Sequence, residues 1–160
     1  MGGVRGQGWV LLVYTMPREP TAPRVAVWRK LKKLGALRLH DAAWALPASD
    51  ALLEQVRWLA EEIREGEGEA LVWQAQGDTR AQDDQLIDHF VAQAERGYQA
   101  LLEALDQPGA NGAELARRYR QIRSIDYFHA PSAETVRTLL ARAHVEAPTK
   151  GTRDGTGEAL

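Results

Sequence analysis

The stretch WVLLVYTMPREPTAPRVAVWRKLKKLG, residues 9–35, decides the fold, because a strand, a rigid loop and a helix follow one another within it. Residues 9–15 are a short apolar run rich in β-formers, which predicts a buried strand. Three prolines stiffen the next segment, and the last of them, Pro23, suits the first turn of a helix. Apolar residues then recur at helical spacing until Gly35 ends the helix.

The following residues predict a hairpin, a second helix and a last strand. Segments 36–40 and 42–47 alternate between apolar and polar residues and are joined by a tight turn, as in a β-hairpin. Either Ser49 or Asp50 can cap the helix that comes next. A fourth strand is expected over residues 69–76.

The order of these elements, β-α-β-β-α-β, is the split βαβ arrangement of ferredoxin-like domains. We therefore predict an α+β fold with a ferredoxin-like sheet over residues 9–76. Residues 79–145 are expected to form a helical extension packed on that unit, so that the chain is one domain overall. The two helices cover one face of the sheet, and the extension or a second subunit is expected to cover the other. The polar, Gly-rich residues 148–160 predict a disordered tail.

Capping residues mark the helices of the second half. Thr79 with Gln82 resembles a capping box, and Asn111 with Glu114 resembles a weaker one. Ser132 can cap the last helix. The tryptophans fall mostly at inward positions and are expected to pack in the core: Trp9, Trp28, Trp44, Trp58 and Trp73.

Composition excludes several classes of site. The chain has 160 residues, of which 44% are apolar and 26% charged, as is ordinary for a globular protein. It has no Cys, which removes disulfides, thiol nucleophiles and thiolate metal sites and fits a reducing cytosol. Its longest apolar run is too short to span a bilayer, and its N-terminus lacks the features of a signal peptide. We expect a cytoplasmic protein that does not associate with membranes.

Charge is strongly segregated along the chain. The net charge is −2, yet residues 17–40 carry seven Lys or Arg against one Glu, and residues 41–160 carry twelve against twenty-one Asp or Glu. Segregation of this kind concerns binding partners rather than the fold. Five cations fall within the first predicted helix: Arg24, Arg29, Lys30, Lys32 and Lys33.

These five side chains are the candidate DNA-binding residues. At 100° per residue, most of the cations spread over the side of the helix opposite Val27 and Leu31, so the helix can lie on the sheet and present a cationic surface. Such a surface suits a phosphate backbone. The alternative is a solvated helix face, but solvated faces usually mix both signs, and this helix has no acid.

The start of the same helix suggests an anion site. Arg24 lies in the first turn, where the helix dipole disfavours a cation. In a ferredoxin-like arrangement Arg18, Arg24 and His40 gather with Asp41 at one end of the sheet. They would bind an anion or a phosphate there if the arginines outweigh the charge of Asp41. Structural ion pairs of Arg24 with Asp41 or with Glu19 are the alternative interpretation.

No sequence pattern supports catalysis. Asp84, Asp88 and His89 form one local cluster, which the helix dipole explains as well as a metal does. Asp126 with His129 resembles an acid–base pair but fits a helix-ending turn equally. We therefore expect neither an enzyme nor a bound metal or cofactor.

Several blocks between residues 9 and 143 resemble a known family. The block P-x-x-P…R-V-x-x-W-R-x-L-K-x-L-G-A, with HDAAWALPAS, EALVWQAQ and RRYRQIRSIDYF, is similar to the N-terminal domain of the ChrB chromate-resistance regulators. The strand and hairpin pattern is also similar to the Cas2-like ferredoxin domain of PaaX-type transcription regulators. The resemblance implies a cytoplasmic bacterial regulator that binds DNA at a chromate-efflux operon and responds to chromate. The predicted helix then matches the family's cationic block at Arg24, Arg29, Lys30, Lys32 and Lys33.

Three functional hypotheses remain. The first is a DNA-binding regulator domain of a chromate-resistance operon, acting as a homodimer because Cas2-like domains usually pair. The second is a protein-interaction module that docks on a separately encoded chromate-sensing domain, because longer members of the family continue into a second domain. Chromate itself is a candidate ligand for the Arg18 and Arg24 end. The third hypothesis is an enzyme, a Cas2-like nuclease. It is disfavoured, because the first strand ends without a carboxylate to hold a metal ion.

Overall fold

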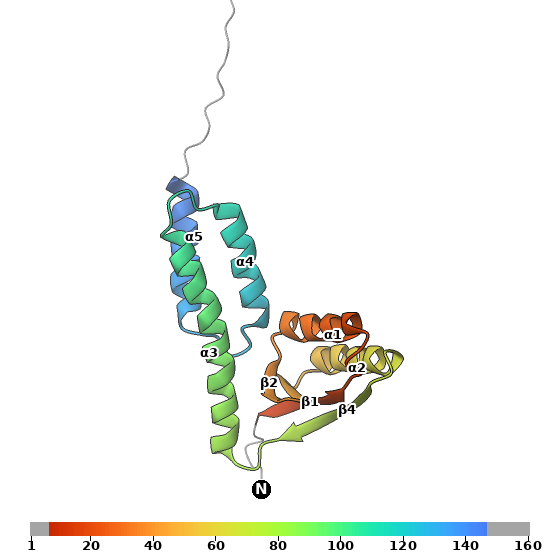
Figure 1. Ribbon diagram of the computed structural model, residues 1–160. Coiled ribbons are helices and arrows are strands. Elements are labelled where there is room, and N and C mark those ends of the chain that lie inside the picture. The colour runs from red at the N-terminus through yellow and green to blue at the C-terminus, as the bar shows by residue number, and fades with distance from the viewer. Residues whose placement is uncertain (1–6, 147–160) are drawn as a thin grey trace, which may run out of the picture.

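The computed structural model describes residues 7–146, with the side chains of residues 7–143. Within this range the fold is α+β, as the sequence predicts, with one four-stranded antiparallel sheet and five helices (Figure 1). The predicted disordered tail, residues 148–160, lies outside the described residues.

The first half of the chain forms the sheet and the two helices that cover it. Its elements are β1 (Gly8–Thr15), α1 (Thr21–Lys33), β2 (Leu37–His40), β3 (Ala43–Pro47), α2 (Asp50–Glu65) and β4 (Glu69–Gln76). The strand order is β2-β3-β1-β4, and every neighbouring pair is antiparallel. Leu11 of the central strand β1 pairs with Ala45 of β3 and with Trp73 of β4, which defines the register.

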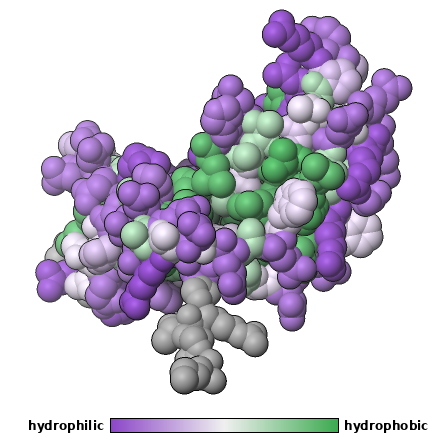
Figure 2. All heavy atoms as spheres, turned by 90° about the horizontal axis from the view of Figure 1, so that it is seen from below, coloured by the Kyte–Doolittle hydropathy of each residue, from purple (hydrophilic) through white to green (hydrophobic). Residues whose placement is uncertain are grey.

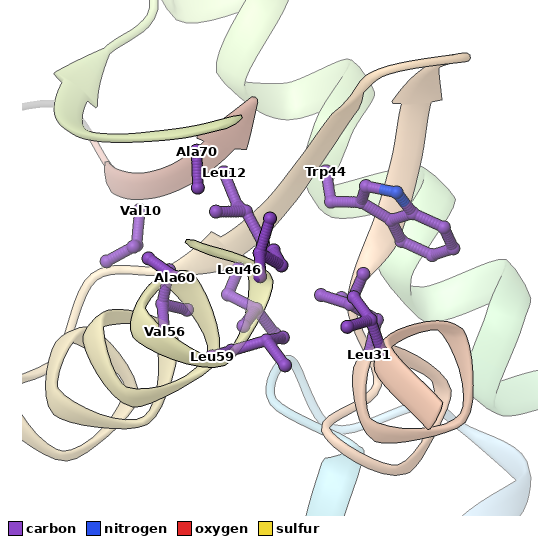
Figure 3. Close-up of a cluster of buried hydrophobic side chains, with 12 residues drawn as sticks. Val10, Leu12, Leu31, Trp44, Leu46, Val56, Leu59, Ala60 and Ala70 are labelled. Carbon is purple, nitrogen blue, oxygen red and sulfur yellow. The ribbon is translucent and has the colours of Figure 1, made fainter. Parts of the chain in front are cut away.

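Helices α1 and α2 lie on the same face of this sheet (Figure 1). Every second residue of β1 points toward them, because side chains alternate along a strand. Val10 and Leu12 thus meet Val56 of α2, and Leu31 of α1 lies below Trp44 of β3 (Figure 3). The cap of α2 is the first of the two predicted candidates, since the Ser49 hydroxyl accepts the backbone N–H of Leu52 at 3.1 Å.

The second half of the chain is a bundle of three antiparallel helices. They are α3 (Arg80–Leu105), α4 (Gly112–Ile125) and α5 (Ser132–Glu146). The bundle has its own apolar core, in which Tyr98, Leu101 and Val136 are fully buried. It stands beside the sheet unit, and the two cores are separate clusters (Figure 1).

Two of the three predicted caps in the bundle are confirmed. The side chains of Thr79 and Asn111 each accept the backbone N–H three residues further on, at 3.2 Å and 3.1 Å. Ser132 behaves differently from the prediction, because its backbone N–H and its hydroxyl both donate to the carboxylate of Glu95, at 2.8 Å and 2.6 Å. The start of α5 is therefore tied to α3.

The bundle is joined to the sheet through Trp9 of β1. The Trp9 indole stacks on Phe90 of α3, with ring centroids 5.7 Å apart. Its N–H donates to the buried Asp83 carboxylate at 2.8 Å, and the same oxygen accepts the backbone N–H of Gly77 at 3.1 Å. One carboxylate thus holds a strand, the link after β4 and the first turn of α3.

The second face of the sheet is open beyond Trp9. Helix α3 follows β4 after a short link and runs past the end of the sheet, so the bundle does not lie across this face (Figure 1). The expectation that the helical extension covers it is therefore wrong. A broad apolar patch is visible from this side (Figure 2). Leu71 and Trp73, which pairing with β1 places on this face, are large exposed side chains.

The expected burial of the tryptophans is confirmed for two of the five. Trp9 and Trp44 are buried, whereas Trp28, Trp58 and Trp73 are 47%, 68% and 55% exposed. On a helix, a residue next to a buried one is rotated by 100° and can leave the buried stripe, as Trp28 does on α1 and Trp58 on α2. Trp73 instead lies on the open face of the sheet.

Replacing Asp83 with Ala should lower the free energy of unfolding by about 2–3 kcal/mol, because the Trp9 indole and the Gly77 amide lose a buried acceptor. Urea unfolding followed by circular dichroism measures the change. Asp84, which is exposed one residue further on, provides the matched control, and D84A should stay within about 0.5 kcal/mol of the wild type. Equal stability of the two variants would contradict the joining role of Asp83.

Candidate functional site

The rotation of α1 about its axis is fixed by its buried residues. Val27 and Leu31 are one turn apart and are fully buried against the sheet. The helix has no acid in its first turn and has Lys30, Lys32 and Lys33 in its last. All five predicted DNA-binding side chains are exposed to solvent: Arg24, Arg29, Lys30, Lys32 and Lys33. The helical spacing predicts this exposure for four of them, whereas it places Arg24 near the apolar face.

Only one of these five cations forms an ion pair within the described part of the chain. The Lys30 ammonium contacts the carboxylate of Glu62 on the neighbouring helix α2. Lys32 lies over the ring of the exposed Trp28, 5.7 Å from its centroid, in a cation–π contact. The prediction that the α1 cations lack acidic partners thus agrees with the described contacts of Arg24, Arg29, Lys32 and Lys33. It is wrong for Lys30, because its partner Glu62 is 32 residues away in sequence.

The predicted anion site corresponds to a cavity of about 540 Å³ at the N-terminal end of α1. Arg18 and Arg24 line it, as predicted, together with Arg38 of β2. His40 is not among the lining residues, so this part of the prediction is wrong. Pairing across the hairpin puts Arg38 opposite Trp44, on the face that carries α1, whereas His40 follows a register shift and pairs with Ala43.

Neither of the structural ion pairs considered for Arg24 is present. Asp41 accepts instead from the Arg38 guanidinium at 3.0 Å, and the Glu19 carboxylate accepts from the Thr21 hydroxyl at 3.5 Å. Among the side chains that the structure describes, Arg24 has no carboxylate within 4 Å. Within the described part of the chain, Arg24 is therefore a cation at the positive end of a helix without an acidic partner.

Tyr14 forms part of the same cavity wall. Burial raises the pKa of its phenol above the ordinary value, and the nearby charges of Arg38 and Arg24 offset this only in part. The hydroxyl therefore stays protonated at neutral pH and can donate a hydrogen bond. The cavity thus combines three guanidinium groups with a phenolic donor.

A second basic helix was not singled out from the sequence. Helix α4 carries four arginines after Glu114 and no further acid up to Ile125; the four are Arg117, Arg118, Arg120 and Arg123. The run RRYRQIR at residues 117–123 could have indicated this basic helix. It was overlooked because the second half of the chain is acidic overall. The side chain of Ile125 closely approaches Gly35, at the end of α1, and Ser124 and Ile125 line a common depression with Lys33.

The geometry of α4 extends the cationic surface of α1. Arg117 and Arg118 precede Ser124 and Ile125 by seven residues, which is two helical turns, so each pair shares one side of α4. They lie about 10 Å along the helix from the junction with α1. Arg117 pairs with Glu114 at 3.3 Å, an exposed contact that costs little to exchange for another anion.

Asp126 and His129, the residues that resembled an acid–base pair, have separate roles. The buried Asp126 carboxylate accepts the Tyr98 hydroxyl at 2.9 Å and the backbone N–H of Ala130. Burial and this carboxylate raise the pKa of the Tyr98 phenol. His129 is exposed and adopts a positive φ of 57°. Asp126 therefore orders the turn between α4 and α5.

Neither a metal-binding cluster nor a membrane-spanning helix is found among the described residues. No group of three or more His, Asp or Glu side chains there could hold a metal ion, including the cluster around Asp84. No helix in the described range is long and apolar enough to cross a bilayer.

The structure defines an α+β domain whose first helix presents a cationic surface next to an arginine-lined cavity. The family model described as "Protein ChrB, N-terminal" matches residues 24–124. The chain belongs to this ChrB family. The matched region includes all of the α1 cations from Arg24 onward and the four arginines of α4, whereas Arg18 precedes it.

One relative is the protein named "Protein ChrB" from Cupriavidus metallidurans. It is 29% identical over 134 residues, which cover 75% of this chain and 40% of that protein. The chain thus spans less than half the length of this relative. No solved structure matches the chain.

Proposed function

We propose that this chain is a DNA-binding domain of a regulator of chromate resistance, and that it binds DNA through the cations of α1. The resemblance to ChrB regulators supports the biological role. The observation that carries the mode of binding is the exposed set of α1 cations, of which only Lys30 has an acidic partner among the described side chains.

The physical argument is the electrostatics of the phosphate backbone. Lys and Arg that neutralise phosphates release condensed counterions, and this release supplies much of the binding free energy. Arg29 and Lys33 are one turn apart, and Lys32 lies beside them, so three cations face solvent within about 6 Å of helix. Arg117 and Arg118 of α4 supply further contacts beyond the junction with α1.

We also propose that residues 8–76 are a ferredoxin-like unit of the kind used by Cas2-like and PaaX-type proteins. The element order β-α-β-β-α-β and the strand order β2-β3-β1-β4 support this assignment.

A homodimer through the open face of the sheet belongs to the same proposal. Many of the residues that face this side from paired strands are apolar: Leu11, Val13, Ala43, Ala45, Leu71 and Trp73. Thr15, Glu69 and His40 are polar residues that the same pairing places on this face. A flat apolar surface can pair with its own copy around a two-fold axis. Because α1 lies on the opposite face, two copies can pair without bringing their α1 cations together, and both α1 helices remain free for DNA.

A second candidate function is docking on a separately encoded chromate-sensing domain. The observation that favours it is a depression between α1 and α2 where the exposed Trp58 lies beside Lys30, Lys33 and Glu62. Tryptophan surrounded by charged side chains is typical of protein-binding surfaces. Loss of partner capture in W58A, with unchanged DNA affinity, would favour this function.

Reversing Lys32 and Lys33 to Glu should weaken binding to the DNA upstream of the gene at least about 100-fold and should lower the slope of log K against log[salt] by about 2. Gel-shift titrations at two salt concentrations, with and without chromate, measure both quantities. The control is the double reversal of Arg80 and Arg142, which lie at the first residue of α3 and in the last turns of α5. The same loss in the control, or no loss in K32E/K33E, would overturn the assignment to α1.

Replacing Leu71 and Trp73 with Lys should raise the dissociation constant of the dimer at least about 100-fold, because two apolar contacts become buried cations. Sedimentation equilibrium measures the change. Trp58→Lys is the control, since Trp58 is also an exposed large apolar side chain but lies on α2, on the other side of the sheet. A wild-type chain that is monomeric at high concentration would contradict pairing through the sheet.

A further inference from the structure

The cavity at the N-terminal end of α1 is built by four separate elements. Tyr14 comes from β1, Arg24 and Trp28 from α1, Arg38 from β2 and Trp44 from β3. The loop between β1 and α1 adds its own residues to the wall. Residues that are far apart in sequence thus converge on one concave space.

The charge in this cavity is unbalanced. Three guanidinium groups line it, against the single carboxylate of Asp41. Asp41 is already engaged by Arg38, and its side chain is 89% exposed, so it neutralises at most one of the three. Arg18 and Arg24 have no acidic partner among the side chains that the structure describes.

Helix α1, which begins at this cavity, adds to the positive potential there. The first turn of α1 contains no acid, and its N-cap residue, Pro20, offers no side-chain acceptor. The backbone N–H groups of this turn therefore have no capping partner from that residue. Arg24 stands at the same end, where the dipole opposes a cation. Among the described side chains, the Glu19 carboxylate lies at the start of α1, where it accepts from the Thr21 hydroxyl at 3.5 Å, and a bound anion would offset the positive potential further.

Three aromatic side chains form part of the remaining wall. Trp28 and Trp44 line the cavity with Tyr14, whose protonated phenol can donate to an oxyanion. A volume of about 540 Å³ falls within the range of small-molecule pockets and exceeds the need of a bare tetrahedral ion. The space therefore admits a tetrahedral group alone or one carried by an organic molecule.

We propose that this cavity binds a doubly charged tetrahedral oxyanion group, held by Arg18, Arg24 and Arg38, either as the free ion or as a phosphate monoester whose organic part stacks on the aromatic wall. Guanidinium groups match such oxyanions because they donate two parallel hydrogen bonds. This site lies at the opposite end of α1 from Lys33, although Lys32 contacts its wall residue Trp28, and it does not depend on DNA binding.

The test is isothermal titration calorimetry of the 160-residue chain at low ionic strength with sulfate, chromate, inorganic phosphate and phenyl phosphate. We expect saturable binding of at least one probe with one site per chain. Phenyl phosphate that binds at least about tenfold tighter than phosphate identifies an ester as the ligand, and equal or weaker binding identifies the free ion. Absence of saturable binding for all four probes overturns the proposal.

Variants locate the site within the chain. R24A, on an exposed position, should weaken binding at least about tenfold, and R24K should recover only part of it, because Lys lacks the bidentate geometry. K33A removes the same charge outside the cavity and should leave the affinity unchanged. Equal losses in R24A and K33A would show unspecific charge screening and overturn the site. K32E/K33E should still bind the probe, even if that variant or the wild type binds no DNA, which separates this proposal from the proposed function.

Discussion

Burial of one apolar stripe of α1 against the sheet is the constraint on which the surface of this protein depends. Val27 and Leu31 are fully buried. Because they lie one turn apart, their burial prevents α1 from rotating about its own axis. Every other side chain of α1 then has a set direction. The cations must face outward, and Arg24 must face the end of the sheet where β1 and the hairpin also terminate.

The joint at Trp9 and Asp83 has a different consequence. It holds the helical bundle at the end of the sheet rather than across it, so the open face remains apolar and exposed (Figure 2). The same placement brings Ile125 of α4 against Gly35 at the end of α1. The hydroxyl of Tyr127 donates to the Leu34 carbonyl at this junction, and the Gln93 amide donates to that of Gly35. Two basic helices from separate cores therefore adjoin.

Three surfaces with different chemistry result, of which two adjoin along α1 and the third lies on the opposite face of the sheet. The sheet offers an apolar plane, α1 and α4 offer a cationic ridge, and the N-terminal end of α1 offers an arginine-lined cavity. The apolar face of the sheet can therefore bind its partner without using side chains of the other two surfaces, whereas Arg24 belongs to both the cationic ridge and the cavity. A chain of net charge −2 can present a strongly positive face because its acidic residues lie elsewhere, for example on α2.

The sequence by itself determined the elements and the outward direction of the cations. Strand β1, the amphipathic pattern of α1 and the caps at Thr79 and Asn111 are local features, which follow from side-chain periodicity and backbone hydrogen bonding. Only the tertiary structure decided the contacts between distant segments. Glu62 reaches Lys30 from another helix, and Arg38 replaces His40 in the cavity because a register shift in the hairpin turns one side chain in and the other out. The bundle lies at the end of the sheet because the buried Asp83 carboxylate binds the Trp9 indole. A contact between two residues so far apart in sequence produces no periodic pattern from which it could be predicted.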